Sequence, residues 1–391
     1  MLVLAFEITT IVASITVFLL FTLMLVGVIL FAKAKLTSSG VVRILINGQE
    51  SIEVETGSSI LTTLSNKKIF LPSACGGGGT CAMCKCRVLS GGGEILTTEK
   101  PYFTRKQLKE NWRLGCQVKV KQNMEILIPE EIFGIKKWEC EVVSNDNVAT
   151  YIKEFIVKLP EGEFLQFEPG SYIQLDVPVT EIDFRNQLYK IDDRFKSDYD
   201  KFNIWNLLMR NTEPIFRAYS MANHPAEGNM IMLNIRLATP PWNRESGKFM
   251  DVNPGICSSY VFASKPGDKV TISGPFGEFH IKPTRKEMVY IGGGAGMAPL
   301  RSHLFHLFHT VKERERKISY WYGGRSLREI FYTEQFREIE KEFSNFTYNI
   351  ALSEPLPEDN WTGYSGFIHN VLFLNYLKSH AEPEEIEYYL C

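Results

Sequence analysis

The sequence predicts a multidomain protein in which one N-terminal membrane-spanning helix precedes an α+β domain, an antiparallel β-barrel domain and an α/β domain. Three observations support this prediction. An uncharged apolar run lies near the N-terminus, four cysteines fall between Cys75 and Cys86, and alternating strands change to alternating strand and helix near residue 285. The predicted boundaries are 1–35, 36–133, 134–284 and 285–391. The net charge of −2 gives no indication of nucleic-acid binding.

The apolar run that begins at Ile8 predicts a transmembrane helix over about residues 8–32. Its 24 uncharged residues span about 36 Å as a helix, which exceeds a hydrocarbon core of about 30 Å. The alternative, a cleaved signal peptide, has a basic start and a shorter apolar core, whereas Glu7 precedes this run and Lys33 and Lys35 follow it. The positive-inside rule then places all later domains in the cytoplasm, on a single-pass membrane protein.

The second segment has the pattern of a small α+β domain. Two strands flank Asn47-Gly48, the commonest hairpin turn, and a short helix is expected over 59–67 with Ser59 or Ser58 as its cap. A loop rich in cysteine and glycine follows, and strands resume after it.

Four cysteines have the spacing of iron–sulfur ligands: Cys75-x5-Cys81-x2-Cys84, followed much later by Cys116. Four thiolates at nearly this spacing hold a [2Fe–2S] cluster in plant-type proteins, and the glycines allow a tight turn that aims N–H groups at sulfur. Structural zinc is the alternative, but zinc ribbons usually carry two paired C-x2-C knuckles. A reducing cytoplasm disfavours disulfides. Cys86 is expected to be a small buried hydrophobe.

From Trp138 the chain reads as alternating strands of an antiparallel barrel. A polar stretch from about Thr180 to Thr212 interrupts this pattern. It is long for a connection, so it is either functional or an insertion with its own short helices.

The last segment has a glycine turn between a strand and a helix. The residues GGGAGMAP at 292–299 suit a nucleotide phosphate at a helix N-terminus, although an ordinary turn is the alternative. His303, His306 and His309 recur on the following helix, where a partly exposed face is expected rather than a metal site.

These motifs, taken in order, resemble the ferredoxin–NADP reductase superfamily. The cysteine spacing is similar to that of β-grasp ferredoxins, RAYSMAN and GPFGEF are similar to the FAD-binding barrel, and G-x-G-x-x-P at 294–299 is the superfamily's form of the nucleotide turn. The resemblance implies that Arg217 binds the flavin pyrophosphate, Tyr219 lies against the isoalloxazine and Ser220 reaches its N5 edge. It also implies that Ser258, or Ser259 as a close alternative, donates to the pyrophosphate.

In the nucleotide domain the resemblance implies NADH binding and a cysteine beside the nicotinamide. The implied binding residues are Gly292, Gly293, Gly294, Gly296 and Pro299, and the implied catalytic cysteine is Cys391. In the superfamily this cysteine begins a Cys-Gly-Pro-Pro motif followed by a helix, so we expect the domain to be truncated here. Arg325 and Arg328 leave NADPH open as the donor.

The whole order of segments resembles the F-subunit family of Na⁺-translocating NADH:quinone oxidoreductases. The resemblance implies electron transfer from NADH through FAD and [2Fe–2S] to other membrane subunits, and indirectly to quinone, at a bacterial cytoplasmic membrane. Two alternatives stay open: a membrane-tethered electron-transfer module with impaired NADH oxidation, and a reductase that feeds an oxygenase. Any sodium path is expected in partners, because the single span has no ionisable residue.

Overall fold

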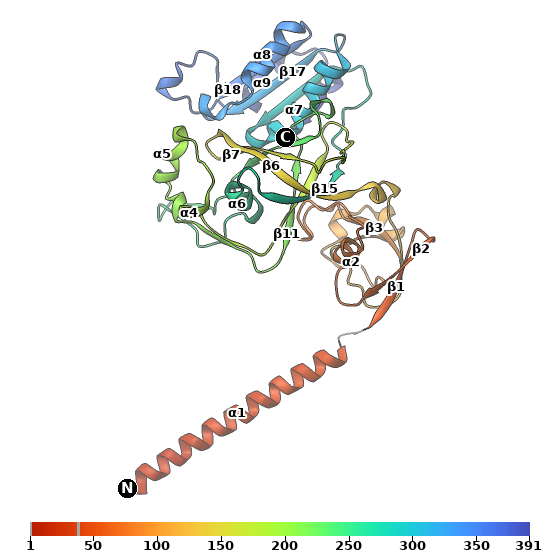
Figure 1. Cartoon of the computed structure of the whole chain (residues 1–391), viewed down its shortest axis with the longest axis vertical. Helices are drawn as coiled ribbons and strands as arrows, with labels where there is room; N and C mark the ends of the chain where they lie inside the picture. The colour runs from red at the N-terminus through yellow and green to blue at the C-terminus, as the bar shows by residue number, and fades with distance from the viewer. Residues whose placement is uncertain (1, 37–39) are drawn as a thin grey trace. The chain divides into compact units, whose positions relative to one another are not determined.

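The structure is a computed structural model that describes residues 2–36 and 40–391 (Figure 1). Its contacts divide the chain into two units. The first consists of Met1–Leu71 and Cys84–Ile132, and the second of Pro72–Met83 and Phe133–Cys391. The loop that carries Cys75 and Cys81 therefore groups with the C-terminal part of the chain.

Helix α1, Leu2–Leu36, is longer than the predicted helix over residues 8–32. Its side chains are described only at residues 13–29 and at Phe31, and all of these are exposed. Within that described stretch, no helix is long and apolar enough to cross a membrane. The side chains of Glu7, Lys33 and Lys35, on which the predicted orientation rests, lie outside the described residues.

The rest of the first unit is an α+β domain, as predicted. Its sheet has the order β2-β1-β5-β3-β4, in which β1 and β5 run parallel. The strands are β1 Val41–Ile46, β2 Glu50–Glu55, β3 Lys85–Ser90, β4 Trp112–Leu114 and β5 Met124–Leu127. Helix α2, Ile60–Asn66, has Ile60, Leu61 and Leu64 buried, and the Ser59 hydroxyl accepts a hydrogen bond from Thr62 N, which confirms the expected cap.

The second unit begins with a six-stranded antiparallel sheet of order β11-β8-β15-β6-β7-β12. Its strands are β6 Lys136–Ala149, β7 Ile152–Lys158, β8 Tyr172–Val177, β11 Ile215–Ser220, β12 Met230–Arg236 and β15 Lys269–Phe276. An antiparallel bridge between Met221 and Leu233 joins the two edge strands. Helix α6, Ile256–Ala263, packs Cys257 and Val261 into the same core.

The predicted insertion between β8 and β11 forms short elements of its own. These are β9 Glu181–Asp183, α4 Phe184–Gln187, α5 Asp193–Lys201, η3 Ile204–Asn206 and β10 Leu208–Arg210. Strands β9 and β10 pair antiparallel. The insertion has a separate buried core that includes Phe184, Phe195 and Tyr199.

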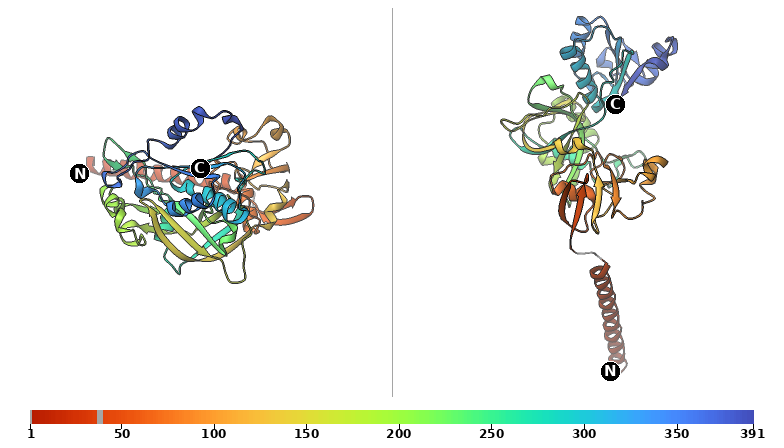
Figure 2. Two further views of the ribbon diagram at one scale, coloured as in Figure 1. Left: turned by 90° about the horizontal axis from the view of Figure 1, so that it is seen from above. Right: turned by 90° about the vertical axis from the view of Figure 1, so that its right-hand side faces the viewer.

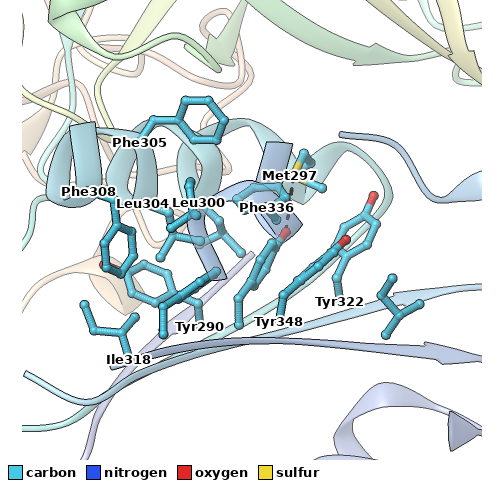
Figure 3. Packing of buried hydrophobic residues seen from close by; sticks show 14 of the residues in the cluster. Tyr290, Met297, Leu300, Leu304, Phe305, Phe308, Ile318, Tyr322, Phe336 and Tyr348 are labelled. Carbon is cyan, nitrogen blue, oxygen red and sulfur yellow. Dashed lines mark hydrogen bonds between the residues drawn. The ribbon is translucent and has the colours of Figure 1, made fainter. Parts of the chain in front are cut away.

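A five-stranded parallel sheet of order β19-β18-β17-β16-β20 completes the second unit, as the α/β prediction requires. Its strands are β16 Met288–Gly293, β17 Ile318–Gly324, β18 Phe346–Leu352, β19 Tyr364–Ser365 and β20 Glu387–Leu390. Helices α7, Met297–Phe305, and α8, Thr333–Glu342, pack on one face (Figure 3). Helix α9, Ile368–Asn375, packs on the other face (Figure 2).

The histidine prediction was wrong for one residue. His303 is completely buried, and its Nε2 lies 3.1 Å from the Pro169 carbonyl and 2.8 Å from the Phe279 carbonyl. Its ring therefore joins α7 to the antiparallel sheet domain instead of facing solvent. The error arose because these two carbonyl partners are far away in the sequence.

Candidate functional site

The cysteine loop of the second unit brings two predicted ligands together. The Cys81 thiol donates to the Cys75 sulfur across 3.3 Å. Burial raises the pKa of Cys75, but hydrogen bonds from the backbone at Thr80 and Cys81 outweigh this effect and lower the pKa to about 6. The loop therefore stabilises a thiolate, which is the form that ligates metal.

Glycines give this loop its shape. Gly76, Gly77 and Gly79 have φ of 64°, 91° and 76°, and Gly77 N donates to the Ser73 hydroxyl across 3.1 Å. Side chains rarely adopt these left-handed conformations, so the loop needs glycine to aim its N–H groups inward. A thiolate surrounded by N–H donors fits the ligand environment of an iron–sulfur cluster.

The other two predicted ligands, Cys84 and Cys116, form a second pair in the first unit. A hydrogen bond with Cys116, together with burial, raises the pKa of Cys84. Cys86 is fully buried, and burial raises its pKa to about 12, which agrees with its predicted role as a small hydrophobe. Among the residues that the structure describes, no group of three or more His, Cys, Asp or Glu side chains is arranged to bind a metal ion.

Strand β11 and the start of α6 form the candidate flavin site. Burial raises the pKa of Cys257 to about 12, and the Arg217 guanidinium opposes this rise. Burial also raises the pKa of Tyr219, which packs against the same buried core as Cys257. Strand alternation puts Arg217 and Tyr219 on one face and Ser220 on the other.

The charges at this site suit a diphosphate. The Arg217 guanidinium makes one hydrogen bond to described residues, from Nη1 to the Phe216 carbonyl at 2.8 Å. Gly255 precedes α6 and has no side chain to cap it. A cation beside the free N–H groups of a helix N-terminus is suited to bind phosphate.

Both predicted serines maintain the turn before α6. The Ser258 hydroxyl donates to the Gly255 carbonyl at 3.0 Å and accepts from Ala238 N at 3.1 Å. The Ser259 hydroxyl donates to the same Gly255 carbonyl at 2.8 Å. A Cβ on Gly255 would lie 2.6 Å from the Ala238 side chain, so close packing requires glycine there.

The cysteine loop packs directly on strand β11. A Cβ at Gly76 would overlap the Arg217 guanidinium and lie 2.5 Å from the Phe216 carbonyl. A second contact is made by Met83, whose sulfur accepts a hydrogen bond from the Tyr172 hydroxyl at 3.7 Å. The thiol pair and the candidate flavin strand are therefore neighbours within one unit. No motif identified Tyr172 beforehand.

The glycine turn lines a cavity of about 530 Å³, a size suited to part of a dinucleotide. Gly293, Gly294 and Gly296 lie on its wall, whereas Gly292 and Pro299 do not. Gly292 instead allows α7 to approach β16, because a Cβ there would lie 2.7 Å from Leu300. Pro299 is buried in the first turn of α7.

Cys391 lies beside this turn. Its backbone N donates to the Ile291 carbonyl at 3.1 Å, and its carbonyl would overlap a Cβ on Gly296. The structure thus brings the predicted cysteine to the predicted phosphate turn. Arg325 lines the same cavity, whereas Arg328 does not.

Sequence patterns missed the residues that join α7 to the antiparallel sheet domain. Arg301 is buried and donates from Nη2 to Glu227 Oε1 at 2.8 Å and from Nη1 to the Ala222 carbonyl at 2.9 Å. Next to it, the Ser302 hydroxyl donates to the Asn223 carbonyl at 2.8 Å. These contacts fix the helix that follows the glycine turn. No local signal marks them, because the partners are more than seventy residues apart.

Family models match the same three segments in chain order. Residues 44–121 match the 2Fe-2S iron-sulfur cluster binding domain, residues 202–281 the oxidoreductase FAD-binding domain, and residues 290–391 the oxidoreductase NAD-binding domain. The chain is therefore an iron–sulfur flavoprotein oxidoreductase that uses a nicotinamide nucleotide.

Similar proteins narrow this class to one family. The chain is 54% identical over 378 residues to the F subunit of the Na⁺-translocating NADH-quinone reductase of Pseudomonas aeruginosa strain UCBPP-PA14, which covers 97% of this chain and 91% of that one. It is 52% identical over 383 residues to the protein of the same name in Klebsiella pneumoniae, with 97% and 92% coverage. The chain belongs to the family of F subunits of Na⁺-translocating NADH-quinone reductases.

Solved structures share the fold at lower identity. Amycolatopsis cytochrome P450 reductase GcoB has a TM-score of 0.59 and 21% identity over 90% of each chain. The ferredoxin reductase in carbazole 1,9a-dioxygenase has a TM-score of 0.54 and 21% identity, again over 90% of each chain. At this level of identity the likeness concerns the fold alone.

Proposed function

We propose that this chain takes electrons from NADH and passes them, through FAD and a [2Fe–2S] cluster, to the membrane subunits of a Na⁺-translocating NADH:quinone oxidoreductase. It would be the component through which electrons enter, with quinone reduced further along the complex. The relatives are named F subunits of Na⁺-translocating NADH-quinone reductases. The proposal assigns the cluster to 36–133, FAD to a closed barrel over 134–284 and NADH to 285–391.

The observation that supports the proposal most strongly is the contact between the cysteine loop and strand β11. Gly76 lies against Arg217, and Met83 lies against Tyr172. Electron transfer between two redox groups requires that they approach closely. A thiol-bearing loop packed on a diphosphate-binding strand provides that approach within one unit.

Residues of this chain have separate tasks in holding FAD, which supplies hydride acceptance and single-electron release. Arg217 and the N–H groups of α6 would bind the pyrophosphate, and Tyr219 would offer a ring face to the isoalloxazine. Ser258 and Ser259 hold the turn that aims these N–H groups. Ser220 is assigned to the N5 edge on the basis of the superfamily resemblance.

The nicotinamide nucleotide would bind in the cavity beside the glycine turn. Gly293, Gly294 and Gly296 leave room for phosphate to approach the backbone. Gly292 and Pro299 shape the turn by fixing α7 against β16. Cys391, beside Gly296, is placed to contact the nicotinamide end.

We assign the cluster ligands as Cys75, Cys81, Cys84 and Cys116. The pair at 3.3 Å and the loop N–H groups around Cys75 support two of them. Cys84 and Cys116 are supported by their mutual hydrogen bond. Four thiolates complete the donor set of a [2Fe–2S] cluster.

We assign α1 as a single-pass anchor in a bacterial cytoplasmic membrane, with the later domains in the cytoplasm. Its described apolar side chains are solvent-exposed, and exposed apolar surface of this extent indicates contact with lipid or with other subunits. The residues that show this exposure are Ile15, Val17, Phe18, Leu19, Leu20, Phe21, Leu23, Met24, Leu25, Val26, Val28, Ile29 and Phe31.

Stopped-flow spectroscopy and electron paramagnetic resonance test the proposal on the full chain in detergent with both cofactors bound. NADH should bleach the oxidised flavin first, and the signal of the reduced cluster should follow. Absence of flavin bleaching, with dithionite still reducing the cluster, would leave a tethered electron-transfer module that does not oxidise NADH. A spectrum with no cluster signal even after dithionite would refute the cluster assignment.

A further inference from the structure

The insertion between β8 and β11 reaches the wall of the dinucleotide cavity. Its core packs against Phe262 of α6 and Leu237 after β12, so it is firmly attached to the antiparallel sheet domain. Helix α5 of the insertion then makes two contacts, one with Arg328 of the nucleotide domain and one with Tyr151, which lies between β6 and β7. Both contacts lie within the second unit.

The first contact is a two-pronged ion pair between Asp198 of α5 and Arg328, which follows β17. Arg328 Nη1 lies 3.0 Å from Asp198 Oδ2, and Nη2 lies 3.2 Å from Oδ1. The Asp198 side chain is only 13% exposed and that of Arg328 only 32%. A paired geometry at such limited exposure holds a guanidinium in one orientation.

The second contact is a pair of rings. Tyr199 of α5 is fully buried, and its ring centroid lies 5.4 Å from that of Tyr151. Tyr151 lines the cavity beside the glycine turn. Helix α5 therefore supports one wall residue through Tyr199 while it restrains Arg328 through the preceding residue.

The charges of the cavity explain why this restraint matters. Arg328 is next to Glu329, which lines the cavity and accepts hydrogen bonds from the backbone and hydroxyl of Thr150. Arg328 Nε lies 3.7 Å from the Glu329 carboxylate, so the guanidinium stands close to the cavity but points toward Asp198. A free arginine at such a position accommodates a 2′-phosphate.

We propose that Asp198 is a positioning residue that withholds Arg328 from the cavity, so that the site favours NADH over NADPH. This gives the insertion a task in nucleotide selection, and it rests on the proposed oxidation of NADH. Asp198 holds Nη1 and Nη2 of Arg328, so Arg328 approaches Glu329 only through Nε, at 3.7 Å. The Glu329 carboxylate in the cavity wall disfavours a 2′-phosphate, and release of Arg328 from Asp198 would add a donor that binds this phosphate.

Binding of two probes without redox activity tests the proposal: ADP-ribose and its 2′-phosphorylated form. Isothermal titration calorimetry on the full chain, with FAD bound in detergent, gives the ratio of their affinities. Asp198→Asn should raise affinity for the 2′-phosphorylated probe about tenfold relative to ADP-ribose, because one charged hydrogen-bonding partner becomes free. Asp198→Glu should keep the wild-type ratio.

Asp193→Asn is the matched control. Asp193 lies on the same helix, is 90% exposed and pairs only with Lys196 among the described residues. The ratio of the two probe affinities in this variant should equal that of the wild type. An unchanged ratio in Asp198→Asn, with ADP-ribose still bound, would overturn this inference alone. Failure of wild type to bind ADP-ribose would overturn the proposed function and this inference with it.

If Asp198→Asn does not fold or does not retain FAD, the variant Arg328→Gln tests the proposal instead. Arg328→Gln should leave the wild-type ratio unchanged, since the guanidinium is already withheld from the cavity. A fall in affinity for the 2′-phosphorylated probe in Arg328→Gln would show that Arg328 already binds phosphate, and it would overturn the proposal.

Discussion

The ion pair between Glu99 and Arg113 is expected to dominate the stability of the α+β domain. Glu99 is completely buried and the Arg113 side chain is 7% exposed. Arg113 Nη2 donates to Glu99 Oε2 at 2.8 Å, and the same carboxylate accepts from Leu114 N at 2.9 Å and Leu96 N at 3.1 Å. Removal of this carboxylate leaves the buried Arg113 cation with only the Gly92 and Gly93 carbonyls as acceptors, and it removes the acceptor of two backbone N–H groups.

The magnitude follows from this geometry. Breaking a buried ion pair by removing one partner costs about 3–5 kcal/mol, because the other charge stays buried and uncompensated. Glu99→Met and Arg113→Met should each lower the free energy of unfolding of this domain by that amount. The double variant should cost clearly less than the sum, because it buries no unpaired charge. Glu53→Met, which breaks the exposed pair with Arg43, should cost less than about 1 kcal/mol.

Hydrogen exchange measured by mass spectrometry is the appropriate assay, because it resolves this domain inside the full chain. Peptides from β3, β4 and β5 should exchange much faster in each single variant, and peptides from the second unit should not change. Additive costs in the double variant, or a single-variant cost as small as that of Glu53→Met, would show that neither single variant leaves a costly unpaired charge in the buried site.

Three further predictions concern the second unit. Burial lowers the pKa of His303 to about 4; between about pH 6.5 and pH 4 the unfolded chain therefore binds a proton that the folded chain does not. The free energy of unfolding should fall by about 3 kcal/mol as the pH drops through this window. In His303→Gln this free energy should depend less on pH, which urea unfolding followed by flavin fluorescence measures. An equal pH dependence in the variant and the wild type would contradict the prediction. Gly76→Ala should slow cluster reduction but not flavin reduction in stopped-flow traces, because the new Cβ meets β11; equal slowing would contradict it. Gly296→Ala should lower kcat/KM for NADH by roughly tenfold or more in a steady-state assay, because the new Cβ would overlap the Cys391 carbonyl. The control Gly134→Ala adds its Cβ to open space, so its kcat/KM should equal that of the wild type.

Features that depend on neighbouring residues could be predicted from the sequence. The Ser59 cap, the hairpin at Asn47-Gly48 and the glycine turn at 292–299 all appear where the patterns placed them. In each of these cases the residues that decide the conformation lie within a few positions of it, so a short window contains the whole cause.

Features that depend on distant partners could not be predicted. His303 occupies a helical position with no local sign of burial, yet its acceptors come from residues 24 and 134 positions away. Asp198 and Arg328 are 130 positions apart, and each by itself resembles an ordinary surface charge. The charged segment at 313–317 shows the same limit: nothing in these residues indicates burial, yet Arg316 is buried and pairs with Glu387 at 2.9 Å.

Three glycines show how the second unit brings its functional segments into contact. Gly76 meets Arg217, Gly255 meets Ala238, and Gly296 meets the last residue of the chain. At each point a Cβ would overlap an atom from another segment of the sequence, so glycine permits backbone to lie directly against its neighbour. Redox groups that exchange electrons or hydride have to lie close together, because both are transferred only over short distances. Close approach of the backbone segments that hold these groups meets this requirement. Gly76 joins the cysteine loop to strand β11, whereas Gly255 and Gly296 each permit a close contact inside one domain. Polar contacts of Arg301 and Ser302 join α7 to the antiparallel sheet domain. A methyl group added at any of the three glycines would therefore displace the segment packed against it.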